Sequence, residues 1–202
     1  MKIGIIDYNA GNLGSVISAI KALGHDVSVI KNFEEFGKID SLVIPGVGSF
    51  SHGMQHLEKA HLVGPLRFYF ESGKPLVGIC LGMHLLASSG MEGHECSGLD
   101  IVPGVVRKLD PVREEKVPHL GWDSINERTP GKLTKQEFYF AHSYYFDIEK
   151  DYESCISATF SWGSKNLPAI IRYKNCTAFQ FHPEKSSHSG MKLLSDVFEL
   201  RE

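Results

Sequence analysis

The chain has 202 residues, of which 42% are hydrophobic and 22% are charged. These values are close to those of average globular proteins and suffice for one hydrophobic core, so we expect a single domain over residues 1–202. The net charge of −3 and the pI of about 6.4 argue against a nucleic-acid partner, and no apolar run is long enough to span a membrane. The cysteines are far apart and form no CxxC pair, which favours a reducing, cytoplasmic environment.

The first part of the chain alternates apolar strand-like runs with segments of helical periodicity. In chain order we expect strands at 2–7, 26–30, 40–46 and 74–80, helices at 12–24 and directly after residue 80, and a largely helical segment at 52–72. Strands that alternate with helices predict a mainly parallel sheet that is covered by helices on both faces.

From about residue 98 the pattern changes to short strand-like runs that are separated by loops. These runs are GLDIVPGVVRKL, GWDSIN, FYFAHSYYF, CISATF, PAIIRY and TAFQFH. A hairpin is predicted to turn at Lys174-Asn175, and a last amphipathic helix is expected at about 189–200. The expected fold class is therefore α/β, with a mainly parallel central sheet flanked by helices and an antiparallel extension.

Two glycine-containing turns follow predicted strands without forming a dinucleotide-binding fingerprint. Gly11-x-x-Gly14 lacks the third glycine, and the second strand ends in Ile30-Lys31 with no acid for a ribose hydroxyl. The PGVG segment at 45–48 is by itself best explained as a tight turn. Its backbone N–H groups gain a catalytic interpretation only if a nucleophile lies nearby. We therefore expect no cofactor.

The ten histidines suggest a metal site, but their spacing does not support one. His52, His56 and His61 have nearly helical spacing, and His94 lies close to Cys96, yet no second pair completes a zinc-like set. We interpret these side chains as solvated helix and loop residues and expect no metal.

Residues 78–82, Gly-Ile-Cys-Leu-Gly, have the form of a nucleophile elbow with Cys80 in the position that serine takes in many hydrolases. A sharp strand-to-helix turn presents such a side chain at the carboxyl edge of the sheet, and small flanking residues relieve crowding. The start of the following helix lowers the pKa of a thiol and leaves N–H groups free for an oxyanion. Taken alone, the segment fits a structural cysteine equally well.

The segment FQFHPEKS at 179–186 supplies a candidate base. An apolar strand is predicted to end at His182, and Pro183 favours an extended backbone there. Residues two apart on an extended chain share a face, so Glu184 could orient the imidazole while the other ring nitrogen faces a thiol. We therefore predict a triad of Cys80, His182 and Glu184.

The segments GICLG and FHPE together resemble the class I (triad) glutamine amidotransferases. The segments IIDYNAGNLGSV, IPGVGSF, PHLGWD, FAHSYY and FHPEKS are similar to the glutaminase subunits of imidazole glycerol phosphate synthase, and the resemblance runs from residue 2 to the last helix. It implies that Cys80 attacks the glutamine carboxamide, releases ammonia and forms a thioester that water hydrolyses. His182 would be the base, and Glu184 would hold its tautomer.

The resemblance also implies roles for residues around the triad. The N–H groups of Val47 and Leu81 would stabilise the oxyanion. The residues implied to contact glutamine are Gly48, His84, Glu92, Ser143 and Tyr144. His84 stands where the family usually has glutamine, and its i+4 spacing places it on the side of Cys80. Imidazole lacks the side-by-side donor and acceptor of a carboxamide. The affinity for glutamine, or the identity of the pathway that the subunit serves, is therefore left open.

The resemblance implies a partner, because the amidotransferase segments occupy the whole chain and leave no room for an ammonia-accepting synthase. In histidine biosynthesis this partner is a (β/α)8-barrel cyclase, which forms a heterodimer with the glutaminase and makes imidazole glycerol phosphate and AICAR. Asn12, Trp122 and Lys185 match positions that lie toward the partner, although Trp122 fits a core aromatic equally well. Glutamine hydrolysis should be weak until the partner is loaded.

Two alternatives stay open. The same scaffold occurs as a paralogue that feeds ammonia to sugar-amidation enzymes of surface-polysaccharide synthesis, and His84 makes this alternative worth testing. A subunit for anthranilate synthesis fits PHLGW and HPEKS poorly. The other alternative is a non-glutaminase cysteine hydrolase or a binding-only subunit. Glu184 argues against an inert scaffold, since an acid two residues after His182 has no obvious packing use.

Overall fold

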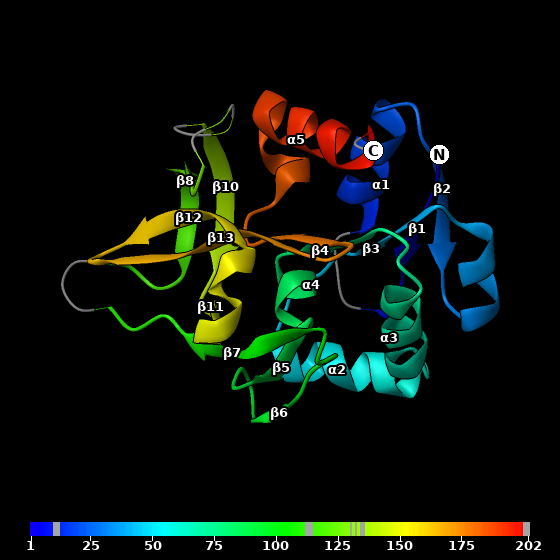
Figure 1. Ribbon diagram of the computed structural model, residues 1–202, viewed down its shortest axis with the longest axis horizontal. Helices are drawn as coiled ribbons and strands as arrows, with labels where there is room; N and C mark the ends of the chain where they lie inside the picture. The colour runs from blue at the N-terminus through cyan, green and yellow to red at the C-terminus, as the bar shows by residue number, and fades with distance from the viewer. Residues whose placement is uncertain (10–12, 112–114, 130, 132, 134–135, 200–202) are drawn as a thin grey trace.

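The computed structural model describes residues 1–9, 13–111, 115–129, 131, 133 and 136–199 (Figure 1). An eight-stranded sheet crosses the molecule in the order β2-β1-β3-β4-β14-β13-β12-β9. Its strands are β1 (Lys2–Ile6), β2 (Asp26–Ile30), β3 (Ser41–Ile44), β4 (Leu76–Ile79), β9 (Asn126–Glu127), β12 (Ile156–Trp162), β13 (Lys165–Tyr173) and β14 (Cys176–Phe179). The pairs from β2 to β14 are parallel and the remaining pairs are antiparallel. This topology confirms the expected fold class.

Helices cover both faces of the parallel part, as Figure 1 shows. They are α1 (Leu13–Ala22) and α5 (Ser187–Glu199) on one face, and α2 (Phe50–Lys59) and α3 (Val63–Glu71) on the other. Val43 and Val77 pack with α1 and α5, whereas Leu42 and Leu76 pack with α2 and α3. Each of these strands is therefore apolar throughout, because both of its faces are buried.

The segment 52–72, which the sequence predicts to be largely helical, is divided between the two helices α2 and α3. The chain leaves the helical conformation after Lys59, and His61 has a φ of 54°. Pro65 explains the break, since a proline inside a continuous helix has no N–H to donate and clashes with the preceding turn. Within the first turn of α3 the same proline is tolerated.

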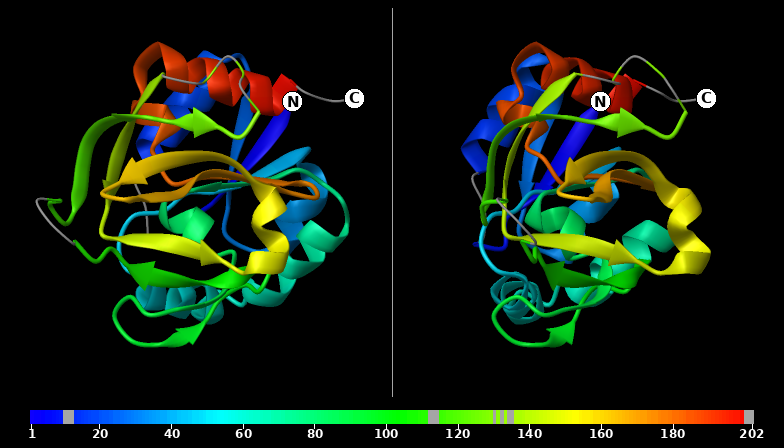
Figure 2. Two further views of the ribbon diagram at one scale, coloured as in Figure 1. Left: turned by 60° about the vertical axis from the view of Figure 1, so that its left-hand side comes forward. Right: turned by 90° about the vertical axis from the view of Figure 1, so that its left-hand side faces the viewer.

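Two smaller sheets flank the antiparallel part of the large sheet. One is the pair β10-β8 and the other has the order β11-β7-β5-β6. Their strands are β5 (Ala87–Gly90), β6 (Cys96–Ser97), β7 (Val102–Lys108), β8 (His119–Ser124), β10 (Glu137–His142) and β11 (Tyr144–Ile148). Figure 2 shows β7 and β11 lying below the β12–β13 hairpin. The run FYFAHSYYF is thus divided between two sheets at Ser143.

The short elements differ in how well they were predicted. The β13–β14 hairpin turns at 174–175, with Tyr173 paired to Cys176, as the sequence predicts. The helix expected after Cys80 is only the single turn α4 (Leu81–His84), and the chain then enters β5. The described residues also form three 3-10 helices: η1 (Phe33–Lys38), η2 (Lys150–Cys155) and η3 (Pro183–Lys185).

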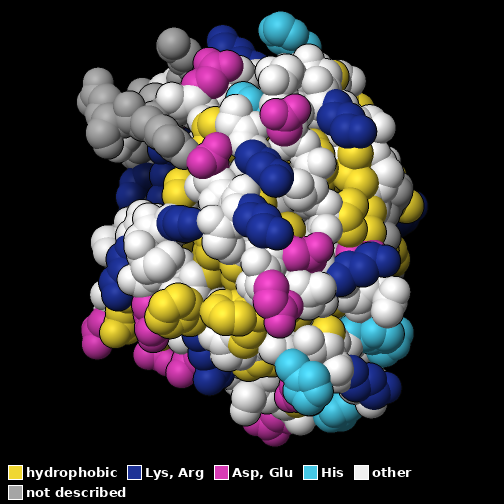
Figure 3. All heavy atoms as spheres, turned by 90° about the vertical axis from the view of Figure 1, so that its right-hand side faces the viewer, with side chains coloured by type: hydrophobic (Ala, Val, Ile, Leu, Met, Phe, Trp, Pro, Cys, Tyr) yellow, Lys and Arg dark blue, Asp and Glu magenta, His cyan; other side chains and the backbone are white. Residues whose placement is uncertain are grey.

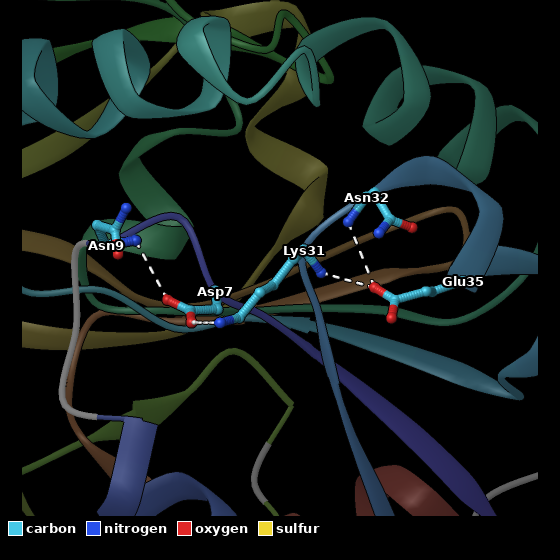
Figure 4. A network of polar contacts seen from close by, with 5 residues as sticks. All are labelled: Asp7, Asn9, Lys31, Asn32 and Glu35. Atoms are coloured by element: carbon cyan, nitrogen blue, oxygen red, sulfur yellow. Dashed lines mark hydrogen bonds and ion pairs between the residues drawn. The ribbon is translucent and has the colours of Figure 1, made fainter.

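The loops after β1 and β2 are joined at the carboxyl edge of the sheet (Figure 4). Lys31 Nζ lies 3.6 Å from Asp7 Oδ2, and the Asn9 N–H donates to Asp7 Oδ1 over 3.2 Å. Glu35 accepts the N–H groups of Lys31 and Asn32 over 2.8 and 3.3 Å. The position after β2 that holds an acid in dinucleotide-binding folds is therefore a lysine that ties two loops together.

The surface near β2 carries charges of both signs. Figure 3 shows Lys and Arg side chains interspersed with Asp and Glu over this face, with hydrophobic side chains between them. A mixed surface of this kind agrees with the small net charge of −3. Among the described residues, no helix has the length and apolar character needed to cross a membrane.

Candidate active site

Strand β4 delivers Cys80 to the carboxyl edge of the sheet in a strained conformation. Its φ is 53° and its ψ is −108°, a combination that residues with a side chain rarely adopt. The Cys80 N–H donates to the Phe179 carbonyl over 2.7 Å, and the Cys80 carbonyl accepts the N–H groups of Met83 and His84 over 2.9 and 3.1 Å. The turn therefore has the geometry of the nucleophile elbow that the sequence predicts.

Glycines on both sides of Cys80 allow this turn to pack closely. A Cβ on Gly82 would overlap the carbonyl oxygen of Ile44, and a Cβ on Gly78 would come within 2.9 Å of the Gly82 carbonyl oxygen. The turn thus has no room for larger side chains at these two positions, in agreement with the expectation that small flanking residues relieve crowding. The helix that follows Cys80 is short, because α4 has only four residues.

His182 and Glu184 meet through a turn and not along an extended strand. β14 ends at Phe179, three residues before His182, and Pro183 begins η3. His182 Nδ1 nevertheless lies 2.8 Å from Glu184 Oε1, with side chains that are 4% and 2% exposed. The predicted contact is confirmed, but the reason given for it from the sequence is wrong.

The imidazole of His182 lies between the side chains of Cys80 and Glu184. Burial lowers the pKa of His182, but hydrogen-bonding and electrostatic interactions with Cys80 and Glu184 outweigh it and raise the pKa to about 10. The ring therefore carries both protons at neutral pH and forms an imidazolium between the two side chains. A thiolate held by an imidazolium is the form of cysteine that acts as a nucleophile.

Ser186, which the sequence analysis did not single out, holds the His182 turn against β10. Its Oγ donates to the His182 carbonyl over 2.6 Å and accepts the Tyr139 N–H over 2.9 Å. The His182 N–H in turn donates to the Tyr139 carbonyl over 2.9 Å. These three bonds fix the backbone of His182, and the segment HPEKS was the available sequence signal for them.

A cavity of about 430 Å³ opens beside Cys80, a volume typical of small-molecule sites. Its lining residues are Val47, Gly48, Ser49, Cys80, Leu81, His84, Glu92, Pro118, Leu120, Ala141, His142, Ser143 and Tyr144. The structure thus brings all of the predicted oxyanion and glutamine-contacting residues to one cavity, from segments that are far apart in sequence.

The PGVG turn forms the wall of this cavity next to Cys80. Val47 is 42% exposed, and Gly48 has a φ of 106°, which glycine adopts without strain. Beneath the turn, the hydroxyl of Tyr8 donates to the Pro45 carbonyl over 2.6 Å. Burial and the negative charge of Cys80 raise the pKa of Tyr8, so this hydroxyl keeps its proton and its hydrogen bond beneath the turn.

Glu92 reaches the cavity while holding the start of α2. Its Oε2 accepts the Phe50 N–H over 3.1 Å, and its carbonyl accepts the Ser51 N–H over 3.2 Å. Burial raises the pKa of Glu92, and the bond from Phe50 opposes this rise. A carboxylate at a helix N-terminus is electrostatically favoured, so α2 positions this acid in the cavity wall.

His84 faces the same cavity as Cys80, as its i+4 spacing predicts. Its Nε2 lies 2.8 Å from Gln180 Oε1, and both side chains are buried. Burial lowers the pKa of His84 to about 4, and the bond to Gln180 opposes this only in part, so the ring is neutral at neutral pH. Gln180 was not identified from the sequence, although it precedes the FHPE segment directly.

The structure describes two of the three residues that were predicted to face a partner, Trp122 and Lys185. Trp122 is 49% exposed, so its interpretation as a core aromatic is wrong. Its ring lies 6.0 Å from that of Tyr139, and Lys185 Nζ lies 6.0 Å from the same Tyr139 ring. Leu120, which the sequence analysis did not single out, is 64% exposed on the same strand. Asn12 lies outside the described residues.

The histidines considered as metal ligands meet only as a pair. His52 Nε2 lies 2.8 Å from His56 Nε2 on the surface of α2. Within the part of the chain that the structure describes, no three His, Cys, Asp or Glu side chains are grouped so that they could hold a metal ion.

Comparison with known proteins agrees with this site. The sequence profile of the family described as "Glutamine amidotransferase class-I" matches residues 4–200. The chain is 41% identical over 199 residues to "Imidazole glycerol phosphate synthase subunit HisH" of Desulfitobacterium hafniense, which covers 96% of this chain and 92% of that relative. It is 40% identical over 203 residues to the protein of the same name from Moorella thermoacetica, covering 98% of this chain and 94% of that relative.

Solved structures share the fold. A "Crystal structure of glutamine amidotransferase" superposes with a TM-score of 0.74 at 18% identity, over 96% of each chain. The "Structure of PurLQS from Thermotoga maritima" superposes with a TM-score of 0.73 at 14% identity, over 98% of this chain and 97% of that one. On the evidence of the matched profile and the full-length relatives, the chain belongs to the class I glutamine amidotransferase family.

Proposed function

We propose that the chain is the glutaminase subunit of an imidazole glycerol phosphate synthase, which hydrolyses glutamine to glutamate and ammonia and passes the ammonia to a synthase partner. The observation that carries the proposal is the contact series Cys80–His182–Glu184 at the edge of a cavity lined by the predicted glutamine-contacting residues. The relatives named HisH support the pathway. We treat residues 1–202 as one amidotransferase domain, which the profile match over 4–200 supports.

In the first half of the reaction, the Cys80 thiolate attacks the side-chain carboxamide carbon of glutamine. The carbonyl oxygen becomes an oxyanion, and the N–H groups of Val47 and Leu81 stabilise it. Loss of one such donor typically raises the barrier by about 2.7–4 kcal/mol. His182, which begins as an imidazolium, gives its proton to the leaving nitrogen, so ammonia departs and a thioester remains on Cys80.

In the second half, water hydrolyses the thioester. The neutral His182 takes a proton from the water, and hydroxide adds to the thioester carbon at the same oxyanion site. Collapse of this intermediate releases glutamate and restores the thiolate–imidazolium pair. Glu184 keeps the Nδ1 hydrogen of His182 on its own side, so Nε2 faces the reacting atoms throughout.

Substrate selection depends on the remaining walls of the cavity. Glu92 contributes a carboxylate for the glutamine ammonium group, and Ser143 and Tyr144 contribute polar groups for its main-chain end. Gly48 leaves room beside the carboxamide. His84 contributes a neutral imidazole whose Nε2–H is already donated to Gln180.

The proposed partner is a (β/α)8-barrel cyclase that binds in a heterodimer in the cytoplasm. The exposed side chains of Leu120 and Trp122 support a docking surface beside the cavity, and Lys185 extends it through Tyr139. Asn12, which lies outside the described residues, stays a predicted partner contact. The four cysteines are free thiols, which supports a reducing compartment.

Ammonia release from glutamine tests the function. The chain is assayed alone, then with a histidine-pathway cyclase, and then with that cyclase loaded with its ligand. We expect strong stimulation by the loaded cyclase and none in Cys80→Ala. Stimulated hydrolysis that survives Cys80→Ala would refute the mechanism.

A second readout separates the chemistry from the pathway. An electrophilic glutamine analogue should label Cys80 in the chain alone. Labelling without stimulation by the cyclase would indicate a competent glutaminase that serves another synthase, such as a sugar-amidation enzyme. Failure of the analogue, while a general thiol reagent still reacts, would indicate that the site does not bind glutamine.

A further inference from the structure

We propose that His142 is a positioning residue for the glutamine-binding corner at Ser143 and Tyr144, and that His119 fixes the tautomer in which it acts. The inference rests on the proposed function, because it assumes that the main-chain end of glutamine binds at this corner. Neither histidine was a candidate from the sequence, and both lie in segments, PHLGW and FAHSYY, that the triad chemistry does not use.

The corner is a place where regular sheet bonding stops. β10 ends at His142 in one sheet, and β11 begins at Tyr144 in another, so Ser143 belongs to neither. The Ser143 carbonyl accepts the Leu109 N–H over 2.9 Å. Across the corner, His142 Nδ1 lies 2.7 Å from the Tyr144 carbonyl oxygen. The imidazole therefore bridges the two sheets at the cavity wall.

The bond to Tyr144 determines where the hydrogen of His142 sits. A carbonyl oxygen only accepts, so Nδ1 must carry the hydrogen. Burial lowers the pKa of His142, the bond to Tyr144 opposes this, and the charges of His84, His119 and His182 lower it further, so the ring is neutral. Its Nε2 is then an acceptor, and it lies 3.2 Å from His119 Nδ1.

His119 is placed to donate from Nδ1 whether it is neutral or charged. Its Nε2 lies 3.4 Å from Asp123 Oδ2 on the same strand, where Gly121, with a φ of 137°, permits the backbone to bend. Its ring stacks on Phe140 and Phe160 with centroids 4.8 and 5.2 Å away. With Nδ1–H directed at His142, the neutral form carries no hydrogen on Nε2, and the charged form directs an Nε2–H at Asp123 Oδ2. Both forms hold His142 in the same tautomer.

The bridge made by His142 fixes the backbone at Ser143 and Tyr144 before glutamine binds. His142, Ser143 and Tyr144 all line the cavity beside Cys80. Without the bridge, the peptide groups on either side of Ser143 gain rotational freedom that binding must then remove. Loss of the bridge should raise KM and leave kcat almost unchanged, because the corner holds the part of glutamine that does not react.

Amide variants provide the test. Asparagine places an N–H donor near the position of Nδ1, whereas glutamine places its amide near Nε2. We expect His142→Asn to keep KM within about threefold of wild type and His142→Gln to raise it by about tenfold or more, with kcat within about threefold in both. We expect His119→Gln to raise KM more than His119→Asn does, and both effects to be smaller than those of the corresponding His142 variants. Equal KM values for folded His142→Asn and His142→Gln would overturn the proposal.

Two further measurements keep the outcome clear. The 15N chemical shifts of the His142 ring should report an Nδ1–H tautomer in wild type, and an Nε2–H tautomer would overturn the proposal whatever the activity. The concentration dependence of labelling by the electrophilic glutamine analogue gives affinity without the partner, and unfolding midpoints identify variants that fail to fold. If wild type shows the expected tautomer but no labelling, the proposed function fails, and with it the assignment of the corner to glutamine.

Discussion

Two histidines in one site hold opposite protonation states, and their neighbours account for the difference. Burial lowers the pKa of both His182 and His84. His182 faces Cys80 and Glu184, and its interactions with them outweigh the burial and raise its pKa to about 10. His84 faces only the neutral amide of Gln180, and its pKa falls to about 4. A charged imidazolium and a neutral imidazole therefore coexist in one site.

Removing the charge of Glu184 should disable the base without removing the nucleophile. An amide in Glu184→Gln can turn its N–H₂ toward Nδ1 of His182 and stabilise the wrong tautomer, and the pKa of the imidazolium falls as the negative charge is lost. We expect kcat for stimulated glutamine hydrolysis to fall by about 10³–10⁴-fold. Steady-state kinetics with the loaded cyclase measures this, with the exposed Glu71→Gln as control. A loss below tenfold would contradict the orienting role.

His84 should make the protein sensitive to acid. Its folded pKa of about 4 lies below the ordinary 6.5, so the unfolded chain binds the extra proton and stability falls as pH drops from 6.5 toward 4. At pH 5 this linkage costs about 2 kcal/mol. His84→Gln removes it, so between pH 7.5 and pH 5 the variant should lose about 2 kcal/mol less free energy of unfolding than wild type. Urea unfolding at both pH values measures the difference.

At the scale of elements, the site depends on how closely α4 packs against the sheet. The helix has four residues and follows Cys80, which has a positive φ. Its main contribution is therefore the placement of the Cys80 turn, because so short a helix has only a small dipole. Gly78 and Gly82 bring its backbone against β3 and β4, and this approach sets where the thiol emerges. The turn of η3, held by Ser186, then brings the base to it.

A single methyl group at Gly82 should disrupt this packing. In Gly82→Ala the new Cβ would overlap the Ile44 carbonyl oxygen, which belongs to a central strand and cannot move without breaking sheet bonds. We expect a loss of about 3 kcal/mol in the free energy of unfolding, or failure to fold. Gly64→Ala, at an exposed position in α3 with no atom within 4 Å of its Cβ, should change stability by less than about 1 kcal/mol. Similar unfolding midpoints for the two variants would contradict this packing.

At the scale of the whole molecule, exposed apolar side chains gather around the mouth of the cavity. Val47, Leu120 and Trp122 are 42%, 64% and 49% exposed, and two of them line the cavity. The parallel strands end at this side of the sheet, where α/β proteins bind their ligands. A partner that covers this surface would close the cavity from water, which fits the proposed passage of ammonia.

Trp122 should therefore contribute to partner binding without contributing to the nucleophile. We expect Trp122→Ala to weaken binding of the histidine-pathway cyclase by about 30-fold, the effect of a hot-spot aromatic, while the glutamine analogue still labels Cys80. Phe68→Ala is the matched control, since this aromatic is similarly exposed but lies on α3, on the other side of the molecule in Figure 1. Calorimetric titration measures both. Equal affinities for the two variants would exclude Trp122 from the docking surface.

The sequence by itself determined the features that depend on local signals. Alternating apolar runs and helical periods gave the mainly parallel sheet and its helices, because side-chain periodicity follows from backbone geometry within one element. The glycines around Cys80 predicted the elbow, and the short spacing between His182 and Glu184 predicted their contact even though the turn differs from the expected strand. Residues this close in sequence remain neighbours in almost any fold.

The tertiary structure alone decided the contacts between distant segments. His84 meets Gln180 across 96 residues, and His119 meets His142 across 23, because strand order and register bring those positions together. The division of FYFAHSYYF between two sheets and the exposure of Trp122 likewise follow from which strands pair and which surfaces are left uncovered. Periodicity within a segment carries no information about its partner, so these arrangements arise only when the whole chain packs.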